Sequence, residues 1–152
     1  MSTHSNFKTL VGMAIQAEVD GKPRHELILE LGPTPESILK NCPGFLPLDL
    51  VLKARNLGKI YFDHMVKKGV IERLPEILAN PKALYRSVST AGMTAAVVMT
   101  FETQNGSPII IPVHGNKQIG RRQVNEVASM YAKEGTDPEV KWKADGLLLW
   151  EA

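Results

Sequence analysis

The stretch TAAVVMTFETQNGSPIIIPVH, residues 94–114, decides the fold of this chain. Before the Asn-Gly pair at 105–106, Val97, Met99 and Phe101 fall on one face of an extended chain, and after it Ile109, Ile111 and Val113 do. Asn-Gly is the strongest short signal for a β-hairpin turn. Alternation with a period of two is typical of strands that bury one face. The stretch therefore predicts two antiparallel strands, over residues 94–103 and 108–114. Because proline cannot donate to a strand ladder, Pro112 puts the second strand at an edge or a bulge.

Further strands flank this hairpin in the sequence. Residues 84–89 and the apolar run 146–150 each have the length and composition of a strand. Between the hairpin and the last strand, residues 121–133 carry apolar side chains at the spacing of an amphipathic helix. This spacing predicts one helix inserted between strands.

The first half of the chain favours helices. Thr34 is placed to cap a short helix that follows a Gly-Pro break. Two more helices are expected over residues 50–67 and 71–78. Residues 11–19 and 25–31 are expected to pair as a hairpin, although the Ala, Met, Gln and Glu residues of this region also suit a helix.

Helices first, and then strands with one inserted helix, is the order of an α+β protein. We expect N-terminal helices packed on a mostly antiparallel sheet of four or more strands. A length of 152 residues suits one domain. Within this single domain, residues 1–30 are expected to form an N-terminal hairpin extension of the main part, residues 31–152.

Composition excludes several classes of protein. No apolar run reaches the roughly 18 residues that a membrane span requires, so no membrane partner is expected. Cys42 is the only cysteine, which excludes an internal disulfide and a cysteine-based zinc site. The four histidines are scattered without ligand-like spacing, and the sequence has no phosphate-binding Gly-Lys-Ser/Thr loop. Neither a metal nor a cofactor is expected.

Positive charge gathers in one segment of a nearly neutral chain. Residues 53–86 carry eight Lys or Arg and three Asp or Glu, a net charge of +5, whereas the whole chain carries +2. A local basic segment suggests a surface that faces a polyanion. The alternative is an ordinary solvated helix face.

Seven short motifs then occur in one ordered series. They are Leu31-Gly32-x-Thr34-Pro35, Leu46-Pro47-Leu48, Lys59-Ile60-x-x-x-His64, Leu74-Pro75-x-x-Leu78-x-x-Pro81, Ser87, Val124-Asn125-x-x-x-Ser129-x-Tyr131 and Gly146-Leu147-Leu148. In order and spacing, this series resembles the phage-type nuclease toxin domains of the barnase/EndoU/colicin/RelE group, or BECR fold. The resemblance covers roughly residues 28–150.

The resemblance implies a metal-independent endoribonuclease toxin that cleaves RNA, often tRNA, through the 2′-hydroxyl of the substrate. It implies action in the bacterial cytoplasm after delivery from a phage or a secreted toxin carrier. It also implies a cognate immunity protein as a partner. For such a partner we expect an acidic surface that covers the basic segment, because complementary charge speeds association.

Cleavage of this kind needs a base, an acid and groups that stabilise the charged phosphate. His64 is the first candidate, because imidazole titrates near neutral pH and the residue lies in the basic segment. Lys59 joins it through the resemblance, yet five residues of a regular helix would turn the two side chains about 140° apart. The alternative for His64 is an ordinary surface or core histidine.

The resemblance also assigns Asn125, Ser129 and Tyr131 to the catalytic site. On the predicted helix, Arg122 would share a face with Asn125 and Ser129 and contact the substrate. A solvated helix face, with Tyr131 in the core, is the open alternative. The remaining candidates for substrate binding are Ser87, His114, Arg121 and Lys68.

Two rival functions stay open. The first is a non-catalytic module of the same fold that binds nucleic acid or protein. The second is a transferase, for which the sequence offers no nucleotide-binding motif.

Overall fold

The structure, a computed structural model, describes residues 3–88 and 93–152. Its centre is an eight-stranded sheet in the order β1-β2-β6-β5-β4-β3-β8, with the short β7 paired to β5. Among the described strands only the β2–β6 pair is parallel. The strands are β1 Ile28–Pro33, β2 Asp49–Lys53, β3 Ala83–Arg86, β4 Ala95–Gln104, β5 Ser107–Ile119, β6 Arg122–Val127, β7 Tyr131–Ala132 and β8 Leu148–Glu151. The predicted α+β class with a mostly antiparallel sheet is confirmed.

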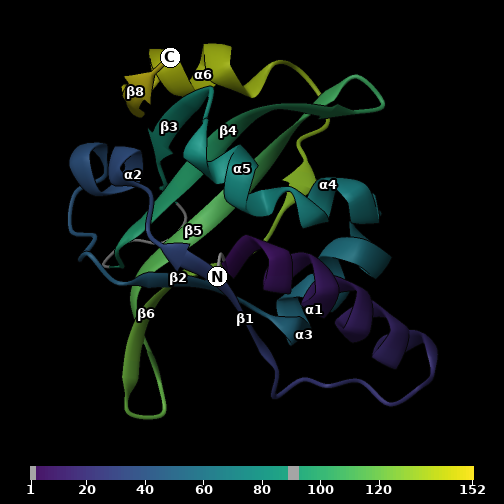
Figure 1. Ribbon diagram of the computed structural model, residues 1–152. Helices are drawn as coiled ribbons and strands as arrows, with labels where there is room; N and C mark the ends of the chain where they lie inside the picture. The colour runs from purple at the N-terminus through teal and green to yellow at the C-terminus, as the bar shows by residue number, and fades with distance from the viewer. Residues whose placement is uncertain (1–2, 89–92) are drawn as a thin grey trace.

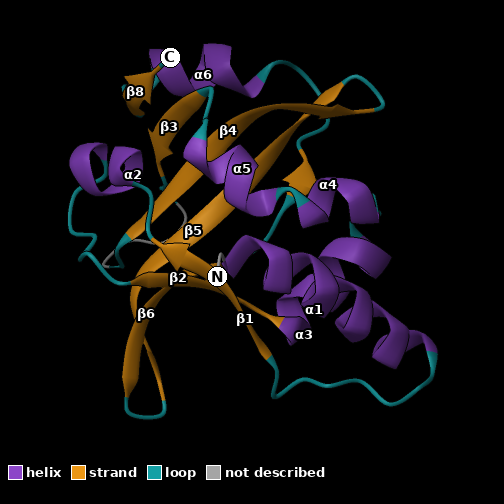
Figure 2. Cartoon of the chain, in the orientation of Figure 1, coloured by secondary structure: helices purple, strands orange, loops and turns teal. Residues whose placement is uncertain are grey.

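Helices gather mainly at one side of this sheet. Figure 1 shows α5 crossing in front of the central strands, and α1, α3 and α4 together at one end, where α1 contacts α3, α4 and β1. Figure 2 separates these helices from the strands by colour. The helices are α1 Thr3–Val19, α2 Glu36–Asn41, α3 Ala54–Gly58, the π-helical turn η1 Lys59–Asp63, α4 Lys68–Glu72, α5 Leu74–Ala79 and α6 Pro138–Ala144. Of the described helices, none is both long and apolar enough to cross a bilayer.

The deciding hairpin forms as the sequence predicts. Strands β4 and β5 pair antiparallel, and Gln104 faces Ser107 across the turn. Asn105 and Gly106 have φ angles of 52° and 82°. Positive φ at both central residues is the requirement of the tight turn that best matches strand twist, and Asn-Gly meets it with little strain.

Pro112 interrupts the sheet inside β5 rather than at its outer edge. Its carbonyl accepts a hydrogen bond from the N–H of Ala128, so its nitrogen, which has no hydrogen, faces the same neighbouring strand. On that side β6 ends at Val127, and pairing with β5 resumes only at β7. After Ala128, residues 129 and 130 lie outside the ladder. The edge or bulge expected at Pro112 is therefore a local break, where the partner of β5 changes from β6 to β7.

Three predicted elements are wrong. Residues 11–19 belong to helix α1 instead of a hairpin, as the open alternative allowed. Residues 121–133 contain β6 and β7 instead of a helix. Residues 50–67 contain β2, α3 and η1 instead of one helix. The side chain of Thr34 does not cap α2, because its hydroxyl donates to the Leu48 carbonyl at 2.5 Å.

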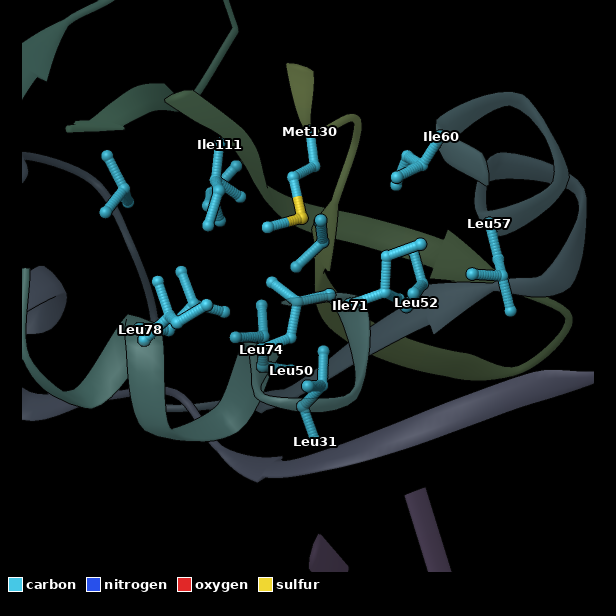
Figure 3. Close-up of a cluster of buried hydrophobic side chains, with 14 of the residues drawn as sticks. Leu31, Leu50, Leu52, Leu57, Ile60, Ile71, Leu74, Leu78, Ile111 and Met130 are labelled. Atoms are coloured by element: carbon cyan, nitrogen blue, oxygen red, sulfur yellow. The ribbon is translucent and has the colours of Figure 1, made fainter. Parts of the chain in front are cut away.

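The main core lies between the helices and one face of the sheet. Figure 3 shows leucines and isoleucines of β2, α3, η1, α4 and α5 converging with Met130. A smaller cluster on the opposite face joins Tyr85, Met99, Ile110 and Leu147 under Trp142 of α6. Because the β2–β6 region is buried on both faces, its strands lack the simple alternation of the hairpin.

Candidate functional site

His64 lies directly after η1, and the structure brings it together with two of the predicted residues. Its Nδ1 atom is 3.2 Å from the Met130 carbonyl oxygen and 3.4 Å from Ser129 Oγ. Its ring centroid is 5.4 Å from that of Tyr131. We call these four residues the His64 cluster. His64, Ser129 and Tyr131 are all partly buried.

The gap beside Pro112 creates this cluster. Ala128 still donates its N–H to the Pro112 carbonyl, but the proline nitrogen has no hydrogen to donate in return, and Ser129 and Met130 lie outside the ladder before β7 begins. This excursion presents Ser129 and the Met130 carbonyl to His64. The Met130 side chain is fully buried in the main core and holds this segment in place. The break beside Pro112 thus places the His64 ring next to Ser129, which lies 65 residues later in the chain.

Asn125 has a structural role and lies outside the cluster. It is fully buried, and its Nδ2 donates to Thr34 Oγ1 at 2.8 Å and to the Leu46 carbonyl at 2.9 Å. Its Oδ1 accepts a hydrogen bond of 2.9 Å from the N–H of Asn116. These bonds tie β6 to Thr34, to the Leu46 loop and to β5, and both amide hydrogens are used within the protein, so the amide has none left for a ligand.

The two arginines predicted to contact the substrate, Arg121 and Arg122, lie outside the His64 cluster. Arg122 makes a forked pair with Glu30, at 2.7 and 2.8 Å, and reaches Asp49 at 3.3 Å. These carboxylates raise the pKa of its guanidinium. Arg121 is exposed in the turn between β5 and β6. Arg122 therefore clamps β6 to β1 and β2 across the sheet.

Lys59 and Lys68 face away from the cluster. Lys59 opens η1, and its carbonyl accepts the backbone N–H of His64 at 3.0 Å, while its side chain lines a hollow beside α1. Lys68 opens α4 and pairs with Glu72 at 3.9 Å. The predicted joint action of Lys59 and His64 on one ligand therefore has no support in this geometry.

The last two candidates, Ser87 and His114, lie at different strands of the sheet. Ser87 follows the end of β3, and β4 separates that strand from β5. His114 lies within β5, opposite Glu126 of β6. Burial lowers the pKa of His114, and the charge of Glu126 partly offsets this. A neutral His114 at pH 7 is the consequence.

Sequence reasoning missed a surface formed by η1 and the turn after it. Phe62 has 41% of its surface exposed and Met65 has 69%. Phe62 rests edge-on against Tyr61, with ring centroids 4.8 Å apart, and Tyr61 packs on the core. Hollows of about 340 and 260 Å³ flank Phe62, one lined by Tyr61, Met65, Val66, Lys67 and Lys68, the other by Glu18, His25, Arg55, Gly58, Lys59 and Asp63. We call Phe62, Met65 and these two hollows the η1 surface.

The cations of the basic segment divide into two groups. Four of the eight are neutralised by ion pairs: Lys53 with Glu126, Lys68 with Glu72, Arg73 with Glu102 and Lys82 with Glu139. Within residues 3–88 and 93–152, the other four form no ion pair, and three of them, Arg55, Lys59 and Lys67, line the η1 surface. The basic segment is thus no continuous polyanion track. Its unpaired charge gathers beside exposed apolar side chains.

Met65 holds an unfavourable backbone conformation on this surface. Its φ angle is 59°, in the left-handed region that glycine usually fills after a helix. We expect Met65→Gly to leave the free energy of unfolding unchanged or to raise it by up to about 1 kcal/mol. The left-handed conformation costs an L-residue roughly 1–2 kcal/mol, and the added entropy of unfolded glycine offsets part of that. Urea unfolding measures the difference, and a loss above about 1 kcal/mol would contradict this account.

The described residues hold no group of three or more His, Cys, Asp or Glu side chains placed to bind a metal ion. Burial raises the pKa of the Cys42 thiol to about 11, so this cysteine stays protonated at neutral pH.

Comparison with known proteins gives one match. Residues 58–151 match the model of a family described as the phage MuF C-terminal domain. The match includes η1, the β3–β6 strands and the C-terminal elements α6 and β8. Neither the search of curated proteins nor the search of solved structures returned a match.

This match overturns the predicted function. It is to a domain of the phage head and morphogenesis type, so the prediction of a ribonuclease toxin is wrong. The link to phage proteins that the resemblance implied is confirmed, whereas delivery from a phage or a toxin carrier stays a prediction. The resemblance of the fold to the barnase-type group stays a prediction.

Proposed function

Since the chain belongs to the family of phage MuF C-terminal domains, we propose that it is a protein-binding module of a phage particle. Its docking site is the η1 surface. The occupant is a segment of a partner protein that carries apolar side chains between acidic ones. No chemical step is required of the module.

The observation that carries this proposal is the exposed Phe62 between two hollows. Large aromatic side chains that stand in the centre of a patch dominate the energy of many protein interfaces. The larger hollow, of about 340 Å³, is at the lower end of the roughly 300–1,000 Å³ range of ligand pockets. It suits one or two side chains of a partner better than a large cofactor.

Charge supports an acidic occupant. The linings of the two hollows include three unpaired cations, Arg55, Lys59 and Lys67, besides Lys68, which pairs with Glu72, and two carboxylates, Glu18 and Asp63. Glu18 already contacts His25, with Nε2 and Oε1 at 3.3 Å. Positive potential at the rim of an apolar patch attracts a negative partner and disfavours a positive one.

A random peptide library displayed against the immobilised chain tests the proposal without knowledge of the partner. Selection on the wild type, with counter-selection on Phe62→Ser, is expected to enrich peptides that combine Asp or Glu with Leu, Phe or Trp. Binding of the enriched peptide is expected to weaken as salt is added, because the rim charges are exposed. Amide shifts in nuclear magnetic resonance spectra should fall within residues 55–68.

Three outcomes would refute it. Enrichment of basic peptides would remove the charge argument. Equal enrichment on wild type and Phe62→Ser would show that the η1 surface is not used. A single-stranded RNA that shifts the amides of residues 55–68, where no acidic peptide does, would make the occupant a nucleic acid.

A further inference from the structure

We infer that His64 is a positioning residue of the η1 surface. Its Nδ1–H donates to the Met130 carbonyl and so fastens the turn that carries Phe62 and Met65 to the sheet. The inference rests on the proposed function, and it assigns His64 a mechanical task in place of direct contact with the partner.

The turn needs support from outside. Two backbone bonds close it over wider spacings than the four residues of an α-helix: the N–H of His64 donates to the Lys59 carbonyl at 3.0 Å, and that of Val66 donates to the Ile60 carbonyl at 3.1 Å. Between them stands Met65 in the left-handed region. Strained and π-helical backbone persists only where surrounding contacts hold it.

Two side-chain bonds tie this turn to β4 and to the connection between β6 and β7. Gln104 Nε2, at the end of β4, donates to the His64 carbonyl at 3.3 Å. On the other side, His64 Nδ1 reaches the Met130 carbonyl at 3.2 Å. Since the side chain of Met130 is fully buried in the main core, this acceptor is itself fixed.

The acceptor determines the tautomer of the ring. A carbonyl oxygen only accepts hydrogen bonds, so the nitrogen beside it must carry the hydrogen. In the neutral ring Nε2 is then the bare nitrogen. Ser129 Oγ, at 3.4 Å from the same Nδ1, is a second and weaker acceptor for this hydrogen. The ring also packs on Tyr131, which limits its rotation.

Asparagine and glutamine separate this role from a general loss of the side chain. The amide nitrogen of asparagine stands close to the position of imidazole Nδ1, whereas that of glutamine reaches the position of Nε2. His64→Asn therefore keeps the donor to Met130, and His64→Gln moves it away. Both variants are polar and similar in size, so they form a matched pair.

The measurements use the full chain with and without the acidic peptide selected on the wild type. We expect His64→Asn to bind this peptide within about threefold of wild type, and His64→Gln and His64→Ala to bind about tenfold more weakly, the effect of one lost hydrogen bond. Amide hydrogen exchange of residues 64 and 66 should accelerate in His64→Gln and stay near wild type in His64→Asn. The ¹⁵N signals of the wild-type imidazole should show the hydrogen on Nδ1.

Failure of this inference differs from failure of the proposed function. A neutral ring with its hydrogen on Nε2, or unchanged exchange in His64→Gln, overturns the tether even where the peptide binds. Peptide binding by His64→Asn that is as weak as binding by His64→Ala also overturns the tether. A wild-type chain that enriches no acidic peptide overturns the proposed function, and the exchange data, recorded without peptide, then decide the tether alone.

Discussion

Replacing Asn125 by alanine is expected to lower the free energy of unfolding by about 3 kcal/mol or more. The change removes three hydrogen bonds and leaves the Leu46 carbonyl and the Asn116 N–H without their side-chain partner. Each buried polar group left unpaired costs about 1–3 kcal/mol. Against a total stability of roughly 5–15 kcal/mol for a domain, this loss is severe. Urea unfolding followed by circular dichroism measures it.

Arg122→Ala is the matched control for this prediction. Arg122 is on the same strand and was assigned to substrate contact by the same reasoning, yet it pairs with Glu30 and Asp49 at the surface. Exposed ion pairs of this kind contribute about 0–1 kcal/mol. Equal losses in the two variants, or a loss below 1 kcal/mol for Asn125→Ala, would contradict the structural role given to Asn125.

Strand β6 shows why part of the fold could not be predicted. Its residues Val124, Asn125, Glu126 and Val127 are all buried, so the strand has no polar face and no period of two. The apolar spacing of residues 124–131 then matched a helix by default. The β4–β5 hairpin was predicted correctly because its turn chemistry is local and its alternation is preserved.

The contacts of the site residues could not be predicted either, because their partners lie far away in the sequence. The partners of Asn125 and Arg122 lie 91 and 92 residues away, at Thr34 and Glu30. No local pattern gives such pairings. His64 and Ser129 were named through the resemblance, and they do meet, but on a strand break at Pro112 instead of a helix face. That proline was the local signal from which the break could be predicted.

The η1 surface could not be predicted from the sequence for a different reason. A regular helix over residues 50–67 would have turned the cations and aromatics of this segment evenly around its axis. The wider π-helical turn instead seats Tyr61 against the core and leaves Phe62 standing on it. Backbone irregularity of this kind occurs often at functional sites, and sequence patterns do not indicate it.

Phe62→Ala is expected to weaken binding of the selected acidic peptide by about 30-fold, which corresponds to about 2 kcal/mol, the size of an interface hot spot. Its free energy of unfolding should change by less than about 1 kcal/mol, because the ring is 41% exposed and rests on the surface of Tyr61. Isothermal titration calorimetry of the peptide, with urea unfolding of both proteins, separates the two effects.

Phe101→Ala is the control that decides where the peptide docks. Phe101, on β4, has an equally large aromatic ring, and 64% of its surface is exposed. It lines a different hollow together with Arg73 and Glu102. It shares the chemistry of Phe62 but lacks the unpaired cations, since Arg73 is neutralised by Glu102. If the η1 surface is the docking site, Phe101→Ala keeps the peptide affinity within about twofold. A loss at Phe101 with none at Phe62 would move the site to β4, because exposed aromatic area alone would then explain the binding.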